Sequence, residues 1–187
     1  ATLDAIIALA PTLKKISAER IRVELNKILV SKRPEYMEAV YETGITGIVL
    51  PEFDELMKTP QNNPHHCYNV GEHTIAALQQ VPADPVLRWT MLLHDIAKPV
   101  CHTTDANGID HFKGHAQVGE NMAKEILRRL KFDNDTIHQV KTLILWHDCR
   151  MTPKKTVIRR ILNKIGPELF EKLMVVQKAD TMAKSMY

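Results

Sequence analysis

Apolar side chains recur every three or four residues along nearly the whole chain. This spacing is typical of amphipathic helices, and no segment shows the apolar and polar alternation of a half-buried strand. Only 7 of the 187 residues are glycine and 5% are aromatic, which argues against a turn-rich β sandwich or a glycine-rich phosphate loop. We therefore expect an all-α fold with one sizeable core.

Capping residues, glycine and proline bound the expected helices. Ser17 is an expected N-cap, Pro34 an expected helix start and Pro99 an expected helix stop. Residues 100–113 are expected to form a polar connection, and any domain boundary lies near residues 45–60. The predicted helices span residues 3–9, 17–30, 34–40, 52–57, 69–80, 86–97, 115–130, 135–147, 153–165 and 167–184.

Charge and cysteine content restrict the class of protein. The 25 basic and 22 acidic residues give a net charge of +3, which does not by itself demand nucleic acid but permits an anionic substrate. Cys67, Cys101 and Cys149 form no C-x-x-C pair, so we expect no disulfide framework and a cytoplasmic location. No segment approaches the roughly 20 apolar residues of a membrane span, and a basic signal-peptide region is missing. Because the chain does not begin with methionine, we expect a processed or excised segment.

Six histidine and aspartate side chains fall at apolar positions of the predicted helices. His94 and Asp95 are adjacent within the apolar segment 91–97, and each needs a partner once it is buried. A single buried histidine is commonly a hydrogen-bonded core residue, but six such side chains together favour a metal site. Imidazole and carboxylate ligands without a thiolate suit an open site for a divalent ion rather than a closed structural zinc site. The six residues are His73, His94, Asp95, His115, His147 and Asp180.

The order of these residues resembles the HD superfamily of metal-dependent phosphohydrolases, which are helical proteins named for their His-Asp doublet. The resemblance implies one or two divalent ions, of Fe, Mn, Ni, Zn, Co or Mg. Two such ions, about 3.5–4 Å apart, activate a bridging water and clamp a phosphate. The implied ligands of the first ion are His73, His94, Asp95 and Asp180, and those of the second are His115 and His147, with Asp95 as the bridge.

Lys98 and His111 join Asp95 as candidate catalytic residues. Lys98 lies one helical turn beyond His94. It is expected either to contact a phosphate oxygen or, as a lysine at the C-terminus of its helix, to interact favourably with the helix dipole. His111 and His102 lie on the connection that would cover the site. They are expected to act as an acid or a substrate contact, or to be solvated loop residues.

Longer segments resemble bacterial tRNA nucleotidyltransferases (CCA-adding enzymes) and poly(A) polymerases that carry an HD domain. The resemblance covers about residues 2–184 and implies a neck-like helical extension, residues 1–50, followed by an HD-domain helical bundle, residues 51–187. The segments that carry it are residues 16–25, 43–52, 61–74, 92–99, 110–115 and 128–132.

One departure from that family bears on activity. The nucleotidyltransferase head needs a glycine-rich segment and a D-x-D pair for Mg²⁺. The chain lacks the first, and Asp133-Asn134-Asp135 is expected to cap a helix instead. The chain is therefore not expected to add nucleotides, and it resembles the C-terminal part of such an enzyme or a stand-alone relative.

Basic residues are expected to form either an RNA-facing surface or a solvated helix face. They are Arg128, Arg129, Lys131, Lys154, Lys155, Arg159 and Arg160.

Three hypotheses follow. The favoured one is a metal-dependent phosphatase or phosphodiesterase acting on nucleotides or RNA ends, including 2′,3′-cyclic phosphates. The alternative is a tRNA-binding neck and body of a nucleotidyltransferase whose head is not in this chain. The third is a structural helical domain whose histidines hold no metal. The expected partners are a phosphorylated nucleotide or RNA end and tRNA, with no membrane, and the sequence does not indicate an oligomeric state.

Overall fold

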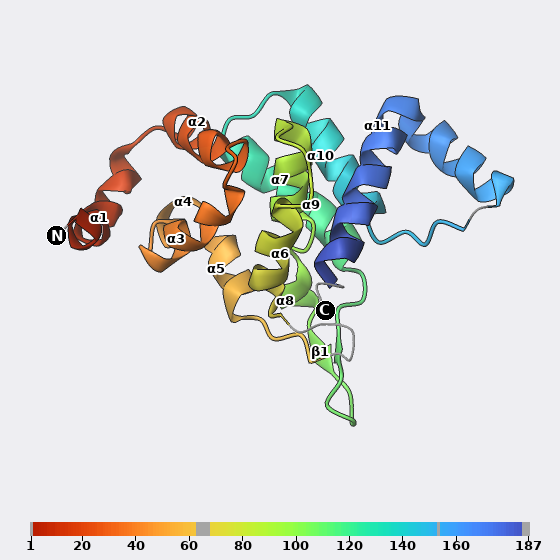
Figure 1. Cartoon of the computed structure of the whole chain (residues 1–187), viewed down its shortest axis with the longest axis horizontal. Helices are drawn as coiled ribbons and strands as arrows, with labels where there is room; N and C mark the ends of the chain where they lie inside the picture. The colour runs from red at the N-terminus through yellow and green to blue at the C-terminus, as the bar shows by residue number, and fades with distance from the viewer. Residues whose placement is uncertain (1, 63–67, 153, 185–187) are drawn as a thin grey trace.

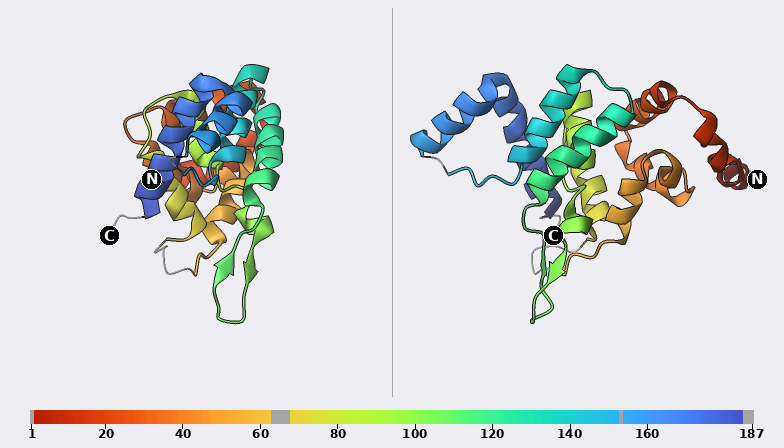
Figure 2. Two further views of the ribbon diagram at one scale, coloured as in Figure 1. Left: turned by 90° about the vertical axis from the view of Figure 1, so that its right-hand side faces the viewer. Right: turned by 180° about the vertical axis from the view of Figure 1, so that it is seen from behind.

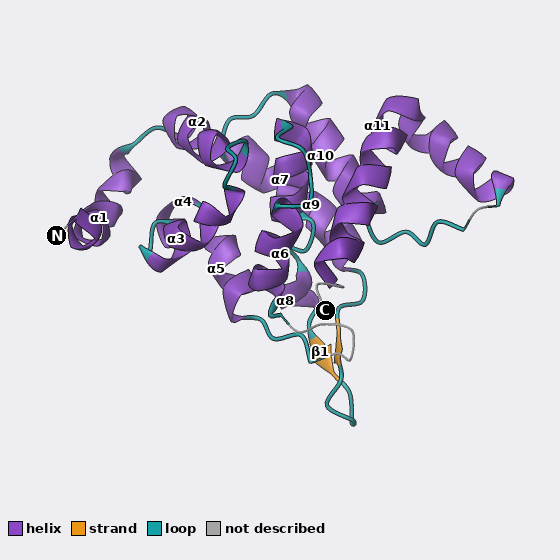
Figure 3. Ribbon diagram, in the orientation of Figure 1, coloured by secondary structure: helices purple, strands orange, loops and turns teal. Residues whose placement is uncertain are grey.

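The structure, a computed structural model, describes residues 2–62, 68–152 and 154–184, and most of them lie in helices (Figures 1 and 3). The expected all-α fold is confirmed. The helices are α1 Thr2–Leu9, the 3-10 helix η1 Ala10–Lys15, α2 Ala18–Leu29, the 3-10 helix η2 Pro34–Tyr36, α3 Met37–Glu42, α4 Thr46–Val49, α5 Pro51–Lys58, α6 Val70–Leu78, α7 Pro85–Leu93, α8 Lys98–Cys101, α9 His115–Arg129, α10 Asn134–Trp146 and α11 Lys155–Lys184. Between α8 and α9 lies an antiparallel pair of short strands, β1 Thr103–Thr104 and β2 Asp110–His111.

The helices form a central body with one projection at each end (Figures 1 and 2). In the body, α10 packs against α9, α7 and α11, and α6 packs against α5, α7 and α11. The helix α1 lies at one end of the molecule, and the first half of α11 lies at the other. The hairpin of β1 and β2 extends away from the body.

One apolar core joins the N-terminal helices to the body. Trp89 of α7 is fully buried, and its ring packs edge-on against Phe132 with the centroids 4.9 Å apart. Its indole Nε1 donates to Asn26 Oδ1 of α2 at 2.8 Å. Leu29 of α2 and Phe53 of α5 are buried in the same cluster. The segment before residue 58 is therefore held to the body by shared burial.

The expected helix over residues 86–97 ends earlier than predicted. The helix α7 stops at Leu93, His94 is its C-cap, and residues 94–97 form a turn before α8. Pro99 lies in the first turn of α8, where its missing N–H leaves no bond unmade, so it helps to begin a helix instead of stopping one. The periodicity could not show this turn, because residues 91–97 are buried on every side.

Three helix boundaries lie where the sequence predicted them. Asp133 is an N-cap, as expected, and accepts a hydrogen bond from the Thr136 backbone at 2.8 Å. Ser17 occupies the N-cap of α2, but its side chain makes no capping hydrogen bond. The two helices expected on either side of residue 166 are separated by Gly166, which has a φ of 80°.

Gly71 allows α6 to approach α5 closely. A Cβ at this position would lie 2.8 Å from the Met57 Cα and would also overlap the Met57 side chain. We expect Gly71→Ala to lower the free energy of unfolding by about 1–3 kcal/mol through overpacking. Gly119→Ala is the matched control, because a Cβ there is 3.4 Å from its nearest neighbour and alanine favours the helix. Urea unfolding of both variants tests this, and equal losses would contradict it.

The described residues bear on the expectations about membrane spans and disulfides. None of the described helices is both long enough and apolar enough to cross a membrane. Cys101 and Cys149 are free thiols. Cys67 and the part of the resembling segment at residues 63–67 lie outside the described residues.

Candidate metal centre

The structure brings all six predicted ligand residues together from separate elements. His73 lies on α6, and His94 and Asp95 lie in the turn after α7. All six are buried, although His73 and Asp180 are 107 positions apart in the sequence. The remaining residues are His115, the first residue of α9, His147, the C-cap of α10, and Asp180, near the end of α11.

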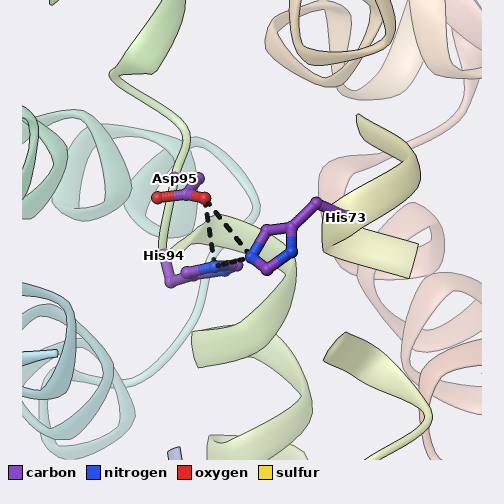
Figure 4. Close-up of side chains that lie close together, drawn as sticks. All are labelled: His73, His94 and Asp95. Atoms are coloured by element: carbon purple, nitrogen blue, oxygen red, sulfur yellow. Dashed lines mark hydrogen bonds and ion pairs between the residues drawn. The ribbon is translucent and has the colours of Figure 1, made fainter. Parts of the chain in front are cut away.

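Asp95 lies between two pairs of histidines. Its Oδ2 is 3.2 Å from His94 Nε2 and 3.8 Å from His73 Nε2, as the close-up shows (Figure 4). Its Oδ1 is 3.4 Å from His115 Nε2 and 3.7 Å from His147 Nε2. Each oxygen therefore belongs to one group of three side chains whose ligand atoms could hold an ion.

Asp180 adds a second carboxylate to the group of His73 and His94. Its Oδ1 is 2.9 Å from His73 Nε2 and 3.6 Å from His94 Nε2. Its Oδ2 forms an ion pair with Lys184 Nζ at 2.6 Å, one helical turn further along α11. Lys184 was not among the predicted site residues, although its i,i+4 spacing from Asp180 was a usable signal.

The orientation of three histidines follows one local rule. The Nδ1 of His94 donates to the Met91 carbonyl at 2.7 Å, three residues earlier. The carbonyls of Phe112 and Ile144 accept in the same way from His115 and His147, at 2.9 and 2.6 Å. Since a carbonyl only accepts, Nδ1 carries the proton in each ring, and Nε2 is left to face the cluster.

This arrangement fits a cation. The Nε2 atoms of His94 and His73 lie 3.4 Å apart, and those of His115 and His147 lie 3.2 Å apart. His115 and His147 both use Nδ1–H for a backbone carbonyl, so in their neutral forms they turn two Nε2 lone pairs toward the same point, where a shared cation would be favourable. Asp95 Oδ2 is buried beside His94, and Lys98 Nζ lies 2.8 Å from it. The donor set of imidazole nitrogens and carboxylate oxygens is one that divalent transition metals prefer.

Ionisation within the cluster reflects burial and close charges. Burial favours the neutral imidazole, but Asp95 and Asp180 outweigh it and raise the pKa of His94 to about 9. Burial likewise opposes the carboxylate of Asp180, yet His73, His94 and Lys184 hold the pKa of Asp180 well below its usual range. Desolvation lowers the pKa of His73. The carboxylate of Asp180 thus stays ionised within the buried cluster.

Lys98 does not end a helix, as one interpretation expected, but begins α8. Its Nζ is 2.8 Å from Asp95 Oδ2 and donates to Gln61 Oε1 at 2.8 Å. It also lies 5.2 Å from the centroid of the Phe112 ring. Gln61 is a buried contact that the sequence analysis missed, because nothing in the polar segment around it marked this one residue.

A cavity of about 490 Å³ opens onto the cluster. Its rim carries Lys113 and Arg150, which are both exposed. His111 also lines this cavity, as expected of the covering segment, and pairs with Asp105 Oδ2 at 2.9 Å. His102 is turned instead toward Asp110 Oδ1, at 2.8 Å. The lining therefore supplies cationic side chains above the histidines and carboxylates.

Asp110 fastens the hairpin to the segment before α6. Its buried carboxylate accepts from the Asn62 backbone at 2.8 Å, from His102, and from Thr104 Oγ1 at 2.7 Å. These bonds, led by that of Asn62, lower the pKa of Asp110 to about 2. The carboxylate thus stabilises the fold above the ordinary pKa of an aspartate, and this contribution disappears as the pH falls through the folded value.

An acid titration tests this role of Asp110. Between pH values of about 4 and 2, we expect the wild-type chain to lose more stability than Asp110→Asn, because asparagine does not titrate. Unfolding midpoints followed by circular dichroism at several pH values measure the difference. Parallel curves for the two proteins would show that Asp110 is not a stabilising carboxylate.

The basic residues predicted to form one surface lie in two separate regions. Arg128, Arg129 and Lys131 are at the end of α9, whereas residues 154–160 lie at the start of α11, in the projection at the far side of the molecule (Figure 1). Arg129 is bound to Glu52 by two hydrogen bonds of 2.7 and 2.8 Å. The single continuous surface is therefore not formed.

The fold and the site together define a helical domain that gathers histidines and aspartates into a buried cluster able to hold divalent metal. Residues 65–184 match the family described as the HD domain, and the chain belongs to this family. Residues 1–57 match a second family, described as a probable RNA and SrmB-binding site of polymerase A.

The chain is also similar to curated enzymes that add nucleotides to tRNA. The CC-adding tRNA nucleotidyltransferase of Thermus thermophilus is 30% identical over 172 residues, which cover 88% of this chain and 39% of the relative. The A-adding tRNA nucleotidyltransferase of Deinococcus radiodurans is 32% identical over 174 residues, with the same two coverages. The multifunctional CCA protein of Actinobacillus pleuropneumoniae is 31% identical over 132 residues, 66% of this chain and 31% of the relative. The chain thus spans about two fifths or less of the length of these relatives.

Proposed function

We propose that the chain is a metal-dependent phosphohydrolase, a phosphatase or phosphodiesterase that acts on nucleotides or RNA ends such as 2′,3′-cyclic phosphates. The orientation of His94, His115 and His147 carries the proposal. Each donates Nδ1–H to a backbone carbonyl and turns Nε2 toward Asp95. A core that served packing alone would gain nothing from gathering three imidazoles around one buried carboxylate, because every polar group removed from water needs a partner.

The proposed ligands form two groups that share Asp95. A divalent ion held there lowers the pKa of a bound water and polarises a phosphoryl oxygen. The ligands of one ion are His73, His94, Asp95 and Asp180, and those of the other are Asp95, His115 and His147.

The remaining side chains would hold the phosphate and move protons. Lys98 lies within 2.8 Å of Asp95, so its ammonium is placed to meet an oxygen of a phosphate bound beside that carboxylate. Lys113 and Arg150 at the rim would attract the anionic substrate. His111, which is partly buried at the cavity edge, would give a proton to the leaving oxygen.

Metal analysis and a substrate panel test the proposal together. We expect the purified protein to contain divalent metal and to hydrolyse at least one of a phosphate monoester, a nucleotide and a 2′,3′-cyclic nucleotide. His94→Ala should lose both properties. His138→Ala is the matched control, because His138 is exposed on α10 away from the cluster. No hydrolysis by the metal-loaded protein, with the metal content of His94→Ala unchanged, would overturn the proposal. Purified protein that contains no metal would favour the structural domain whose histidines are empty.

A second candidate function is the binding of tRNA by the N-terminal helices. The match of residues 1–57 to a probable RNA-binding region, and the tRNA nucleotidyltransferases among the relatives, favour it. On this view the chain positions tRNA in a cytoplasmic enzyme whose nucleotide addition needs a further domain. Binding to tRNA should weaken steeply with salt. No measurable affinity at low salt would exclude this function.

A further inference from the structure

A second cavity lies directly beside the metal centre. It has a volume of about 480 Å³ and is lined by residues from the start of α9 and the end of α10. Gly114, His115 and Asp148 line both this cavity and the one that opens onto the cluster. A ligand could therefore lie across this shared wall, with one part at the metal-binding cluster and the other in the second cavity.

The walls of the second cavity differ from those of the first. Trp146, Leu145, Cys149 and Ala116 supply apolar surface, whereas the metal cavity is dominated by charged and imidazole groups. Gln117 adds an amide that both donates and accepts hydrogen bonds. A pocket of this size and mixed lining suits a flat, largely apolar group with polar edges.

Trp146 contrasts with the other tryptophan of the chain. Trp89 is fully buried, and its Nε1 is bonded to Asn26. Trp146 is only half-buried, and its Nε1 has no hydrogen-bond partner within residues 2–62, 68–152 and 154–184. An indole at a cavity wall with an unused donor provides a stacking surface together with a hydrogen-bonding edge.

We propose that this second cavity binds the base of a nucleotide whose phosphate lies at the metal centre. The inference rests on the proposed function and adds to it a site that recognises the base of the nucleotide, or of the terminal nucleotide of an RNA. The ribose would cross the wall formed by Gly114, His115 and Asp148. Stacking on Trp146 supplies affinity without strong preference among the bases.

Equilibrium binding tests this subsite without any turnover. Adenosine 5′-monophosphate and ribose 5-phosphate share the sugar phosphate, and only the first carries a base. We expect the metal-loaded wild-type protein to bind the nucleotide at least tenfold more tightly. We also expect the nucleotide, but not ribose 5-phosphate, to quench tryptophan fluorescence. Equal affinities with no selective quenching would overturn the proposal.

Two substitutions locate the effect. Trp146→Leu should lower the nucleotide-to-ribose-phosphate affinity ratio by roughly 5- to 100-fold, the range of one base stack, whereas Trp146→Phe should retain most of it. The selective quenching should be lost in Trp146→Phe although Trp89 remains. A ratio unchanged in a folded Trp146→Leu protein would overturn the assignment.

A failure of this inference is distinguishable from a failure of the proposed function. Hydrolysis of a phosphate monoester without a base tests the metal centre alone. Activity toward that ester combined with no preference for the nucleotide would reject the base subsite and leave the hydrolase in place. If Trp146→Leu does not fold, the wild-type quenching and affinity ratio still decide the matter.

Discussion

The Asp95→Asn variant is expected to lose metal binding at both groups of ligands. Its rate of phosphate-ester hydrolysis is expected to fall by a factor of about a hundred or more. Substituting a residue that merely hydrogen-bonds to a metal ligand already costs 10- to 100-fold in metal affinity or activity. Asp95 itself is placed to provide one oxygen to each group of ligands. Asparagine has nearly the same size but no charge, so packing is preserved while the anionic bridge is removed. Metal content per chain and the rate of hydrolysis are the two measurements.

A matched change outside the site gives the control for Asp95. Asp133→Asn makes the same chemical substitution at the N-cap of α10, where asparagine also caps well. Metal content and activity should stay at the wild-type level in this protein. Retention of a full metal complement by Asp95→Asn would show that the two groups do not depend on a shared carboxylate.

Trp89→Ala is expected to lower the free energy of unfolding by about 3–5 kcal/mol. The fully buried indole fills the space between α7 and Phe132, and its hydrogen bond to Asn26 connects α2 to the body. The loss should therefore include both a cavity and an unpaired amide. Urea denaturation followed by circular dichroism measures it from the shift in midpoint at constant slope.

Asn26→Ala separates the hydrogen bond from the packing. This variant removes the acceptor but keeps the indole, so we expect a loss of only about 1–2 kcal/mol. If both variants lose the same amount, then the hydrogen bond, and not the buried ring, dominates the junction. A loss below about 1 kcal/mol in Trp89→Ala would contradict the central position of this residue in the core.

The helices could be predicted well where one face of each is apolar. The segments that became α2, α9 and α10 have charged residues on the opposite side, so their periodicity is clear. The segment around His94 could not be predicted in the same way, because its residues are buried on all sides and carry no periodic signal. The hairpin was missed for another reason, since strands of two residues are too short for any alternation to show.

The candidate site could be predicted as a set of residues but not as a geometry. Ligand-type side chains at apolar positions are visible in the sequence, and the structure places all six in one cluster. The backbone carbonyls that orient the rings, and the contact of Gln61 with Lys98, depend on turns and long-range packing. Such contacts carry no residue-type signature, so they appear only when the chain is folded.

The 107 positions that separate His73 from Asp180 have a consequence for how the protein reaches its native state. The cluster draws on five segments, so no local folding event can assemble it, and the entropy of closing a very long loop must be met first. Metal that binds only the assembled cluster should therefore stabilise the native state, and the loss of bound metal during unfolding would report the loss of the long-range tertiary structure. A fragment that lacks α11 would have no complete site to fill, because Asp180 lies on that helix.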